Sequence, residues 1–339
     1  MNKKRVLAML LAGAMALSMT ACGGGSASSG DGSSNDGGAS ASGGSYKVSV
    51  ILKTLAAEYW QYVKSGAEDY ASEHSDKVTV EVKGPSSETA FDEMQNMIET
   101  DLSSGSYDGV IISPLQSDTA AQLVSGTKLP IVAIDTNFTA PEVKSFVGTG
   151  NEAAAKKGGE AAVEAAKAAG WTDIKCIEIA GVQGDQTNTA RMNGYKAGVE
   201  EAGGTFLSDE VQYADATADR ATTAMEAIMQ THPEGIAIIC ANNDDMAMAA
   251  ARAAQGHDAY KNTIFLGFNG DRAACEAILA GQMTMSVAQM AYEMGYKAVE
   301  TMVQVLDGET VDEFVDSGSD VVTPDNAQER LDTLKTQLH

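Results

Sequence analysis

The chain has 339 residues and a formal net charge of -24, from 47 acidic and 23 basic side chains. This acidity disfavours nucleic acid and anionic lipid as partners, because both are bound through basic patches. The cysteines after position 22 lack paired spacing and the 4 histidines are scattered, so neither a disulfide framework nor a metal site is predicted. Cys176 and Cys240 lie in apolar runs, where we expect buried free thiols.

Residues 1–22 indicate an export signal. Basic residues at positions 3–5 precede an apolar run that is too short for a membrane span of about 20 residues. The run ends in Met19-Thr20-Ala21-Cys22, which resembles a bacterial lipoprotein cleavage site, so we expect Cys22 to carry lipid and to form the mature N-terminus. The alternative is a secreted protein with an unmodified cysteine. Residues 23–45 are nearly all Gly, Ser, Ala, Asp and Asn, which predicts a disordered tether holding the folded body at the outer face of the cell membrane.

From residue 46 onward, apolar runs typical of strands alternate with segments of helical periodicity. Such alternation implies parallel strands joined by right-handed crossovers, hence an α/β fold with doubly wound parallel sheets. The pattern restarts near residue 152, which indicates two lobes. The expected strands are 48–52, 77–82, 109–112, 130–134, 145–147, 174–180, 205–213, 236–240, 263–268, 283–288 and 320–322. The expected helices are 58–74, 89–103, 117–125, 152–169, 188–202, 218–230, 243–255, 271–280, 292–306 and a closing helix.

Polar residues stand at the predicted carboxyl ends of strands or at the helix starts that follow them. In an open parallel sheet these positions line the ligand crevice. Tyr59 and Trp60 add two aromatic faces. Sugars need this combination, because each hydroxyl both donates and accepts while the C–H faces of the ring are apolar. The polar set, drawn from both lobes, is Lys53, Asp135, Arg191, Asn243, Asn269 and Gln289.

An exported dinucleotide-dependent oxidoreductase is an alternative. Residues 148–153, GTGNEA, match the fingerprint G-x-G-x-x-A, and Asp173 follows about twenty residues later. The strand before the fingerprint is short, however, and Asp173 begins a strand where the motif needs an acidic residue at a strand end. We therefore interpret the segment as a turn between lobes, and we expect a binding protein without catalytic residues or a cofactor.

Short motifs are spread over nearly the whole folded body. They are 52–55 (LKTL), 59–60 (YW), 132–135 (VAID), 190–194 (ARMNG), 243–248 (NDDMAM), 267–270 (GFNG), 280–284 (AGQMT) and 287–289 (VAQ). In order and spacing they resemble the motifs of type I solute-binding proteins of bacterial ABC importers, in particular the ribose and D-allose binding proteins.

The resemblance implies how the site is divided between the lobes. Lys53 and Asp135 would bind sugar hydroxyls from the first lobe, with Tyr59 and Trp60 against the ring. The second lobe would contact the same sugar through Arg191, Asn243 and Asn269, and Gln289 would lie at a crossing between the lobes. On this basis we expect Trp60→Ala to abolish binding and to leave thermal unfolding nearly unchanged.

The resemblance also implies an architecture and a function. Three crossings form the hinge, near residues 150, 289 and 317, so the lobes would be 46–149 plus 290–316 and 150–289 plus 317–339. The expected function is a monomeric, lipid-anchored receptor that captures a monosaccharide or polyol by hinge closure and delivers it to an ABC permease. A ligand-sensing subunit for a membrane kinase or chemoreceptor is the alternative.

The chain departs from the family pattern in three places that bear on the choice of ligand. Asn269 stands where the family usually has Asp, which removes one charge-assisted acceptor. Ala218 replaces an aromatic residue of the second lobe, and Ala57-Glu58 replaces Asn-Pro before the first-lobe aromatics.

Overall fold

The structure is a computed structural model that describes residues 45–338. The expected leader, the lipidated Cys22 and the tether up to residue 44 lie outside the described residues. Within residues 45–338, no helix combines the length and the apolar character that a membrane span requires.

Six parallel strands form the first sheet, in the order β12-β5-β4-β3-β1-β2. The strands are β1 (Tyr46–Ile51), β2 (Val78–Lys83), β3 (Gly109–Ile112), β4 (Ile131–Ile134), β5 (Val143–Gly148) and β12 (Phe314–Asp316). The accompanying helices are α1 (Glu58–Glu73), α2 (Phe91–Ser104), α3 (Ser117–Val124) and α9 (Ala291–Leu306).

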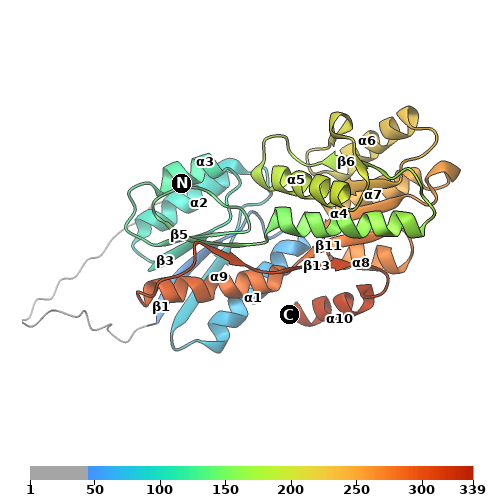
Figure 1. Cartoon of the computed structure of the whole chain (residues 1–339). Helices are drawn as coiled ribbons and strands as arrows, with labels where there is room; N and C mark the ends of the chain where they lie inside the picture. The colour runs from blue at the N-terminus through green and yellow to red at the C-terminus, as the bar shows by residue number, and fades with distance from the viewer. Residues whose placement is uncertain (1–44, 339) are drawn as a thin grey trace, which may run out of the picture. The chain divides into compact units, whose positions relative to one another are not determined.

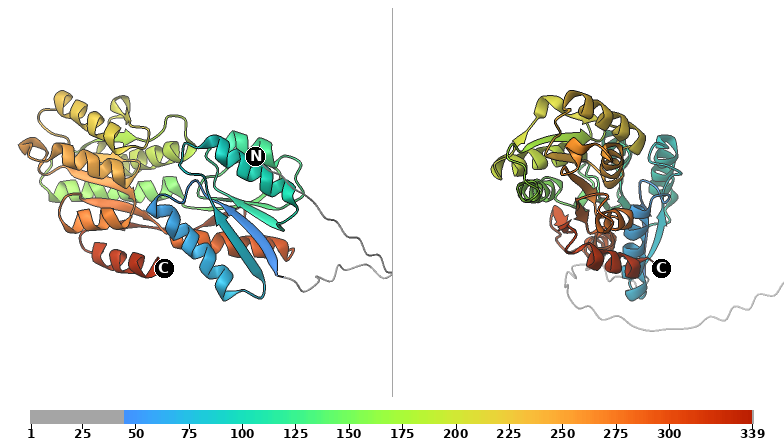
Figure 2. Two further views of the ribbon diagram at one scale, coloured as in Figure 1. Left: turned by 180° about the vertical axis from the view of Figure 1, so that it is seen from behind. Right: turned by 90° about the vertical axis from the view of Figure 1, so that its right-hand side faces the viewer.

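Side chains of the central strands point alternately to two helical layers, as the pleat requires. In β3, Val110 and Ile112 pack with α2 and α3, whereas Ile111 packs with α1 and α9. Seen from behind in Figure 2, the teal α2 and α3 cover one side of this sheet and the light-blue α1 lies on the other. Helices α1 and α9 approach so closely that a Cβ on Gly66 would lie 1.9 Å from the carbonyl oxygen of Tyr292. The late segment α9 is therefore built into the first lobe, beside α1 (Figure 1).

The second sheet has seven strands, in the order β13-β11-β10-β9-β6-β7 with β8 also pairing β6. The strands are β6 (Lys175–Ala180), β7 (Thr205–Phe206), β8 (Gln212–Tyr213), β9 (Ile238–Ala241), β10 (Ile264–Asn269), β11 (Met285–Gln289) and β13 (Ser319–Val322). The helices are α4 (Asn151–Ala168), α5 (Gln186–Glu201), α6 (Ala218–Thr231), α7 (Asp244–Ala254), α8 (Arg272–Leu279) and α10 (Ala327–Gln337), with 3-10 turns η1 (Ser208–Glu210) and η2 (Asp258–Tyr260). Helices α4 and α5 cover one face, and α6, α7 and α8 cover the other.

The fold class is confirmed, with three local differences. The single strand expected at 205–213 is wrong, because Leu207 turns into η1 and the chain pairs with β6 once before this turn and once after it. Strand β13 runs antiparallel to β11, against the all-parallel expectation. Strand β12 was not expected, since its sequence is short and mostly exposed. Cys176 and Cys240 are buried and free, as expected, with their Sγ atoms 3.3 Å apart.

The chain crosses between the sheets three times, after β5, after β11 and between β12 and β13. Two crossings are bonded to each other: the backbone N–H of Ser317 donates to the carbonyl of Gly148 at 2.8 Å, and Thr149 and Ser317 bring their hydroxyls within 3.4 Å. The segment that matches the dinucleotide fingerprint thus begins at the end of β5 and runs into α4, at a crossing. The third crossing, at Gln289, is described with the site.

Candidate functional site

Asp135 presents its carboxylate from a strained turn at the end of β4. Its φ is 62°, in the left-handed region that Asp tolerates better than most residues. Oδ1 accepts a hydrogen bond of 2.8 Å from the Tyr59 hydroxyl, and Oδ2 accepts one of 2.9 Å from the Thr136 hydroxyl. The Lys53 ammonium lies 3.7 Å from Oδ2, and both charged side chains are largely shielded, at 19% and 11% exposed. The structure therefore brings Lys53, Tyr59 and Asp135 together.

Burial shapes the chemistry of Tyr59. Burial raises the pKa of Tyr59 well above its ordinary value. The negative charge of Asp135 and the hydrogen bond to it contribute to the same increase, to a smaller extent. The phenol consequently stays protonated and serves as a donor to the carboxylate. The same hydroxyl also lies 3.8 Å from the sulfur of Met294 in α9.

Trp60 lies inside the first lobe rather than on its surface. Its side chain is 3% exposed, its ring meets that of Tyr59 edge to face at 5.0 Å, and its Nε1 donates to Glu88 at 2.8 Å. This burial argues against the expectation that Trp60→Ala leaves thermal unfolding nearly unchanged, because the substitution empties a packed site. A contact between Trp60 and a bound ring stays a prediction.

Arg191 comes from α5 of the second lobe and is buried and held on several sides. Nε donates to Oδ1 of Asn151 at 2.8 Å, Nη1 donates to the carbonyl of Asn242 at 2.8 Å, and the guanidinium lies 3.8 Å above the Phe268 ring. Burial lowers the pKa of Arg191, and the negative charge of Asp135 acts against that decrease. Among residues 45–338, no carboxylate lies within 4.0 Å of this guanidinium.

Of the remaining candidates, Asn269 and Gln289 lie together and Asn243 does not join them. Gln289 Nε2 donates to Asn269 Oδ1 at 2.9 Å, and Asn269 Nδ2 lies 3.4 Å from Oδ2 of Asp271. Asn243 caps α7: its Oδ1 accepts from Met246 N at 2.9 Å, and its Nδ2 donates to the Ala216 carbonyl at 3.1 Å. Both ends of the Asn243 amide are thus engaged within the second lobe.

Within residues 45–338, one ion pair joins the two lobes. Nη2 of Arg272, the first residue of α8, lies 3.1 Å from Oε2 of Glu58, the first residue of α1. The other oxygen of Glu58 accepts a 2.9 Å hydrogen bond from the Tyr62 hydroxyl. We call the Glu58–Arg272 pair the lobe bridge. Its acidic partner, Glu58, lies in the Ala57-Glu58 pair, where the chain departs from the family pattern.

Several residues that hold the candidates in place were not predicted from the sequence. Asn151 and Asn242 support Arg191, and Thr136 supports Asp135. Each lies at a strand end or a helix start beside a segment already singled out, so its position was a usable signal. The contact made by Arg330 of α10 could not be predicted from the sequence. Its Nη2 donates to the Gln289 carbonyl at 2.7 Å, although the two residues are 41 positions apart.

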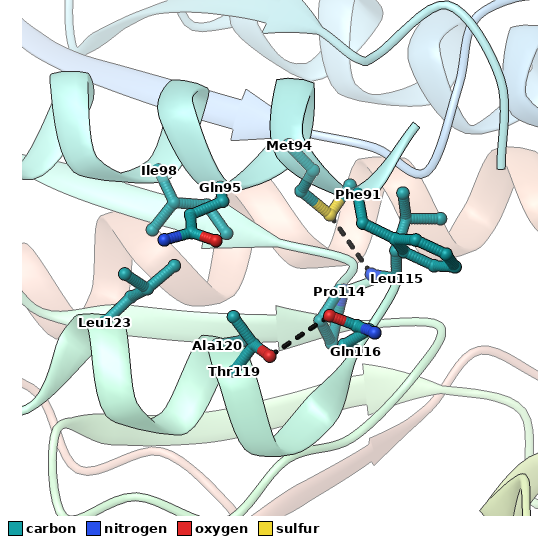
Figure 3. A pocket seen from close by; sticks show the side chains of 10 residues that line it. All are labelled: Phe91, Met94, Gln95, Ile98, Pro114, Leu115, Gln116, Thr119, Ala120 and Leu123. Carbon is teal, nitrogen blue, oxygen red and sulfur yellow. Dashed lines mark hydrogen bonds between the residues drawn. The ribbon is translucent and has the colours of Figure 1, made fainter. Parts of the chain in front are cut away.

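An apolar hollow lies elsewhere, between α2 and the start of α3. Figure 3 shows Phe91, Met94, Pro114 and Leu115 around it, and none of the eight candidate side chains lines it. Its few polar groups are partly engaged, for example Thr119 with Gln116 at 3.1 Å. Within the described residues there is also no cluster of His, Cys, Asp and Glu that could hold a metal ion.

The sequence is similar to known proteins over most of its length. A profile described as a periplasmic binding protein domain matches residues 48–310. The D-allose-binding periplasmic protein of Escherichia coli (strain K12) is 30% identical over 265 residues, which cover 75% of this chain and 83% of the relative. The ribose import binding protein RbsB of Bacillus subtilis (strain 168) is 26% identical over 274 residues, which cover 80% and 85%.

Solved structures agree on the fold. A carbohydrate transporter solute binding protein from Agrobacterium radiobacter, in complex with D-arabinose, superposes with a TM-score of 0.75 at 23% identity, covering 88% of this chain and 100% of that one. A solute binding protein from Bacillus halodurans with bound myo-inositol gives 0.74 at 22% identity, covering 86% and 99%.

The chain belongs to the periplasmic binding protein family, and its two parallel-sheet lobes are those of the type I members. The family consists of non-catalytic solute-binding proteins, which confirms the expectation of a binding protein and overturns the oxidoreductase alternative.

Proposed function

We propose that this protein captures a small sugar or polyol between its lobes, outside the cytoplasm, and delivers it to an ABC permease. The observation that carries the proposal is the placement of two opposite charges on different lobes. Asp135 of the first lobe acts electrostatically on Arg191 of the second, yet the two do not form an ion pair within 4.0 Å. Charge-assisted hydrogen bonds from both groups to the hydroxyls of one ligand would join the lobes.

Neighbouring groups suit a neutral polyhydroxylated ligand. The Asn269–Gln289 amide pair offers donors and acceptors, and its neighbour Asp271 acts electrostatically on Tyr59, as Asp135 and Arg191 do. Tyr59 itself supplies an apolar ring face. Relatives named for D-allose, ribose and D-apiose support the same class of ligand. Asn269, in place of the usual Asp, lacks a charge, so we expect a hydroxyl pattern different from that of the ribose proteins.

The lobes are proposed as residues 46–149 plus 290–316 and 150–289 plus 317–339, which agrees with the membership of strands and helices in the two sheets. Attachment to the membrane through a lipid on Cys22 is proposed from the leader alone. Mass spectrometry of the exported protein tests it: a lipid-sized mass increment on an N-terminal Cys22 is expected, and an unmodified cysteine would contradict it.

The ligand class is tested by calorimetric titration of the protein with D-ribose, D-allose, D-fucose, D-arabinose and myo-inositol. We expect at least one to bind with a Kd well below about 1 mM, as exothermic closure around a polar ligand. Failure of all five, and of a wider panel of pentoses, hexoses and nucleosides, would reject the sugar receptor.

A sensor for a membrane kinase or chemoreceptor would bind the same sugar. Uptake of that sugar by cells lacking the gene distinguishes the sensor from a transport protein. Loss of uptake supports delivery to an ABC permease.

A further inference from the structure

A fully buried glutamate lies in the second sheet beneath Arg191. Glu178 is in β6, is 0% exposed and pairs in register with Cys240 of β9. It projects to the same face as Cys176, toward the apolar layer under α4 and α5. Its Oε1 accepts one hydrogen bond, of 3.0 Å, from Nδ2 of Asn242, while Oε2 has no hydrogen-bond partner among the described residues. Such a carboxyl is costly in an apolar core and calls for an explanation.

Asn242 links this carboxyl to the ligand-binding charge. Its side-chain Nδ2 points at Glu178 and lies 3.5 Å from the Asn188 carbonyl, so acceptors surround this nitrogen and define the orientation of the amide. Its backbone carbonyl accepts the 2.8 Å hydrogen bond from Nη1 of Arg191. Asn242 therefore connects Glu178 to the guanidinium, with its side chain bonded to the carboxyl and its backbone carbonyl bonded to Arg191.

The environment favours the neutral carboxylic acid. Burial raises the pKa of Glu178 to about 8, although the Asn242 hydrogen bond and the charge of Arg191 act in the opposite direction. The other titratable groups that face it are Tyr195 of α5, Cys176 of its own strand and Cys240 of β9, which bring no positive charge. Because Oε1 faces an N–H donor, the proton belongs on Oε2. Glutamine would reproduce this arrangement in shape and hydrogen bonding.

We propose that Glu178 is a positioning residue for ligand binding: through Asn242 it holds the Arg191 guanidinium flat over Phe268. The guanidinium has several N–H donors, and Nε and Nη1 are used to fix it, which leaves others for a ligand. This role deepens the proposed function, on which it rests through the assignment of Arg191 to the ligand. Without the Glu178 acceptor, the Asn242 side chain keeps only the longer 3.5 Å contact with the Asn188 carbonyl, and the Asn242 carbonyl that holds Nη1 is free to shift.

The first test needs no ligand. In the full-length protein, the 15N–1H signal of Arg191 Nε, assigned by its loss in Arg191→Lys, should be shifted upfield by the Phe268 ring and should exchange slowly with water. Glu178→Gln should keep this position, and Glu178→Leu should move it toward that of exposed arginines. Glu142 is a matched control, because it also has a carboxylate oxygen without a partner but lies in the first lobe. Glu142→Leu should leave the Arg191 signal in place.

An Arg191 signal at the wild-type position in Glu178→Leu would overturn the proposal. If that variant does not fold, Glu178→Asp decides instead, since its shorter acid cannot reach Asn242 and should shift the signal as well. An unchanged signal in a folded Glu178→Asp would be equally contrary to the proposal.

The second test uses whichever of D-ribose, D-allose, D-fucose, D-arabinose or myo-inositol the wild type binds. Glu178→Leu should weaken binding about tenfold or more, whereas Glu178→Gln and Glu142→Leu should stay within about twofold. Above about pH 8 the wild-type affinity should fall, because ionised Glu178 attracts the guanidinium toward itself, and Glu178→Gln should show no such fall. Equal affinities and equal pH profiles would refute the proposal. If none of these sugars binds, the proposed function fails by itself and the Arg191 signal still decides the role of Glu178.

Discussion

The Tyr59 hydroxyl donates a 2.8 Å hydrogen bond to Oδ1 of Asp135, so an aromatic residue of α1 orients the carboxylate at the end of β4. Tyr59→Phe keeps the ring and removes this bond. Hydrogen bonds to charged groups contribute roughly 1.5–3 kcal/mol, so we expect affinity for the bound sugar to fall about tenfold or more. Calorimetry measures the change, and an affinity within twofold of the wild type would show that Tyr59 does not orient Asp135.

The lobe bridge should favour the closed form. Arg272→Ala removes the 3.1 Å contact with Glu58, and because exposed ion pairs contribute little, affinity should fall only modestly, by up to about fivefold. The loss should shrink at high salt, because exposed charges are screened. Lys335→Ala is the control, since its pair with Asp332 lies within α10. If both variants bind alike, the bridge does not contribute to closure.

Trp60→Ala should now affect stability first. The ring is 3% exposed and packs on Tyr59, and such truncations cost about 3–5 kcal/mol. Denaturant unfolding should show this loss, and Phe314→Ala, at a ring that is 43% exposed, should cost much less. A Trp60→Ala protein of wild-type stability would place the ring at the ligand instead of in the core.

Stability should depend on pH through Glu178. Its pKa rises from 4.5 to about 8 on folding, so between these values the folded protein holds a proton that the unfolded chain has lost. Stability therefore falls as pH rises through this window, and this decline should be missing in Glu178→Gln. The advantage of Glu178→Gln in free energy of unfolding should thus grow from about pH 5 to about pH 8.

Asp244, whose pKa is raised by burial to about 6, has the same sign of effect, but it is present in both proteins and cancels in the comparison. A difference between wild type and Glu178→Gln that stays constant with pH would mean that Glu178 is ionised in the folded protein.

The positions of the site residues were predictable where local sequence controls them. The apolar run of β4 ends at Asp135, and that change from apolar to charged marks a strand end in any parallel sheet. Likewise, most strands and helices of both lobes follow from periodicity within short windows, with β12 and the region 205–213 as exceptions. The orientation of side chains was less predictable. The Asn243 side-chain oxygen accepts a hydrogen bond from the first turn of α7. Its amide nitrogen donates to the Ala216 carbonyl, 27 residues away, and this second bond fixes the orientation of the side chain.

Long-range packing accounts for the other differences. Trp60 is buried where its Nε1–H donates to Glu88, 28 residues later, and its ring packs on Tyr59. The helical periodicity around Trp60 predicts neither contact. The region 205–213 has apolar residues enough for one strand, but its two halves pair with different parts of β6 around a 3-10 turn. Such pairings depend on register across the sheet rather than on the segment itself.

We propose that Asp135 and Arg191, from opposite lobes, hold one ligand between them. Calorimetric titration of the wild type, Asp135→Ala and Arg191→Met with the same sugar tests this arrangement; methionine keeps an unbranched stem over Phe268. Removing one partner of a buried charged hydrogen bond costs about 2–5 kcal/mol, so both variants should lose affinity by roughly 30-fold or more while remaining folded. Wild-type affinity in either variant would show that the ligand is not held between these two residues.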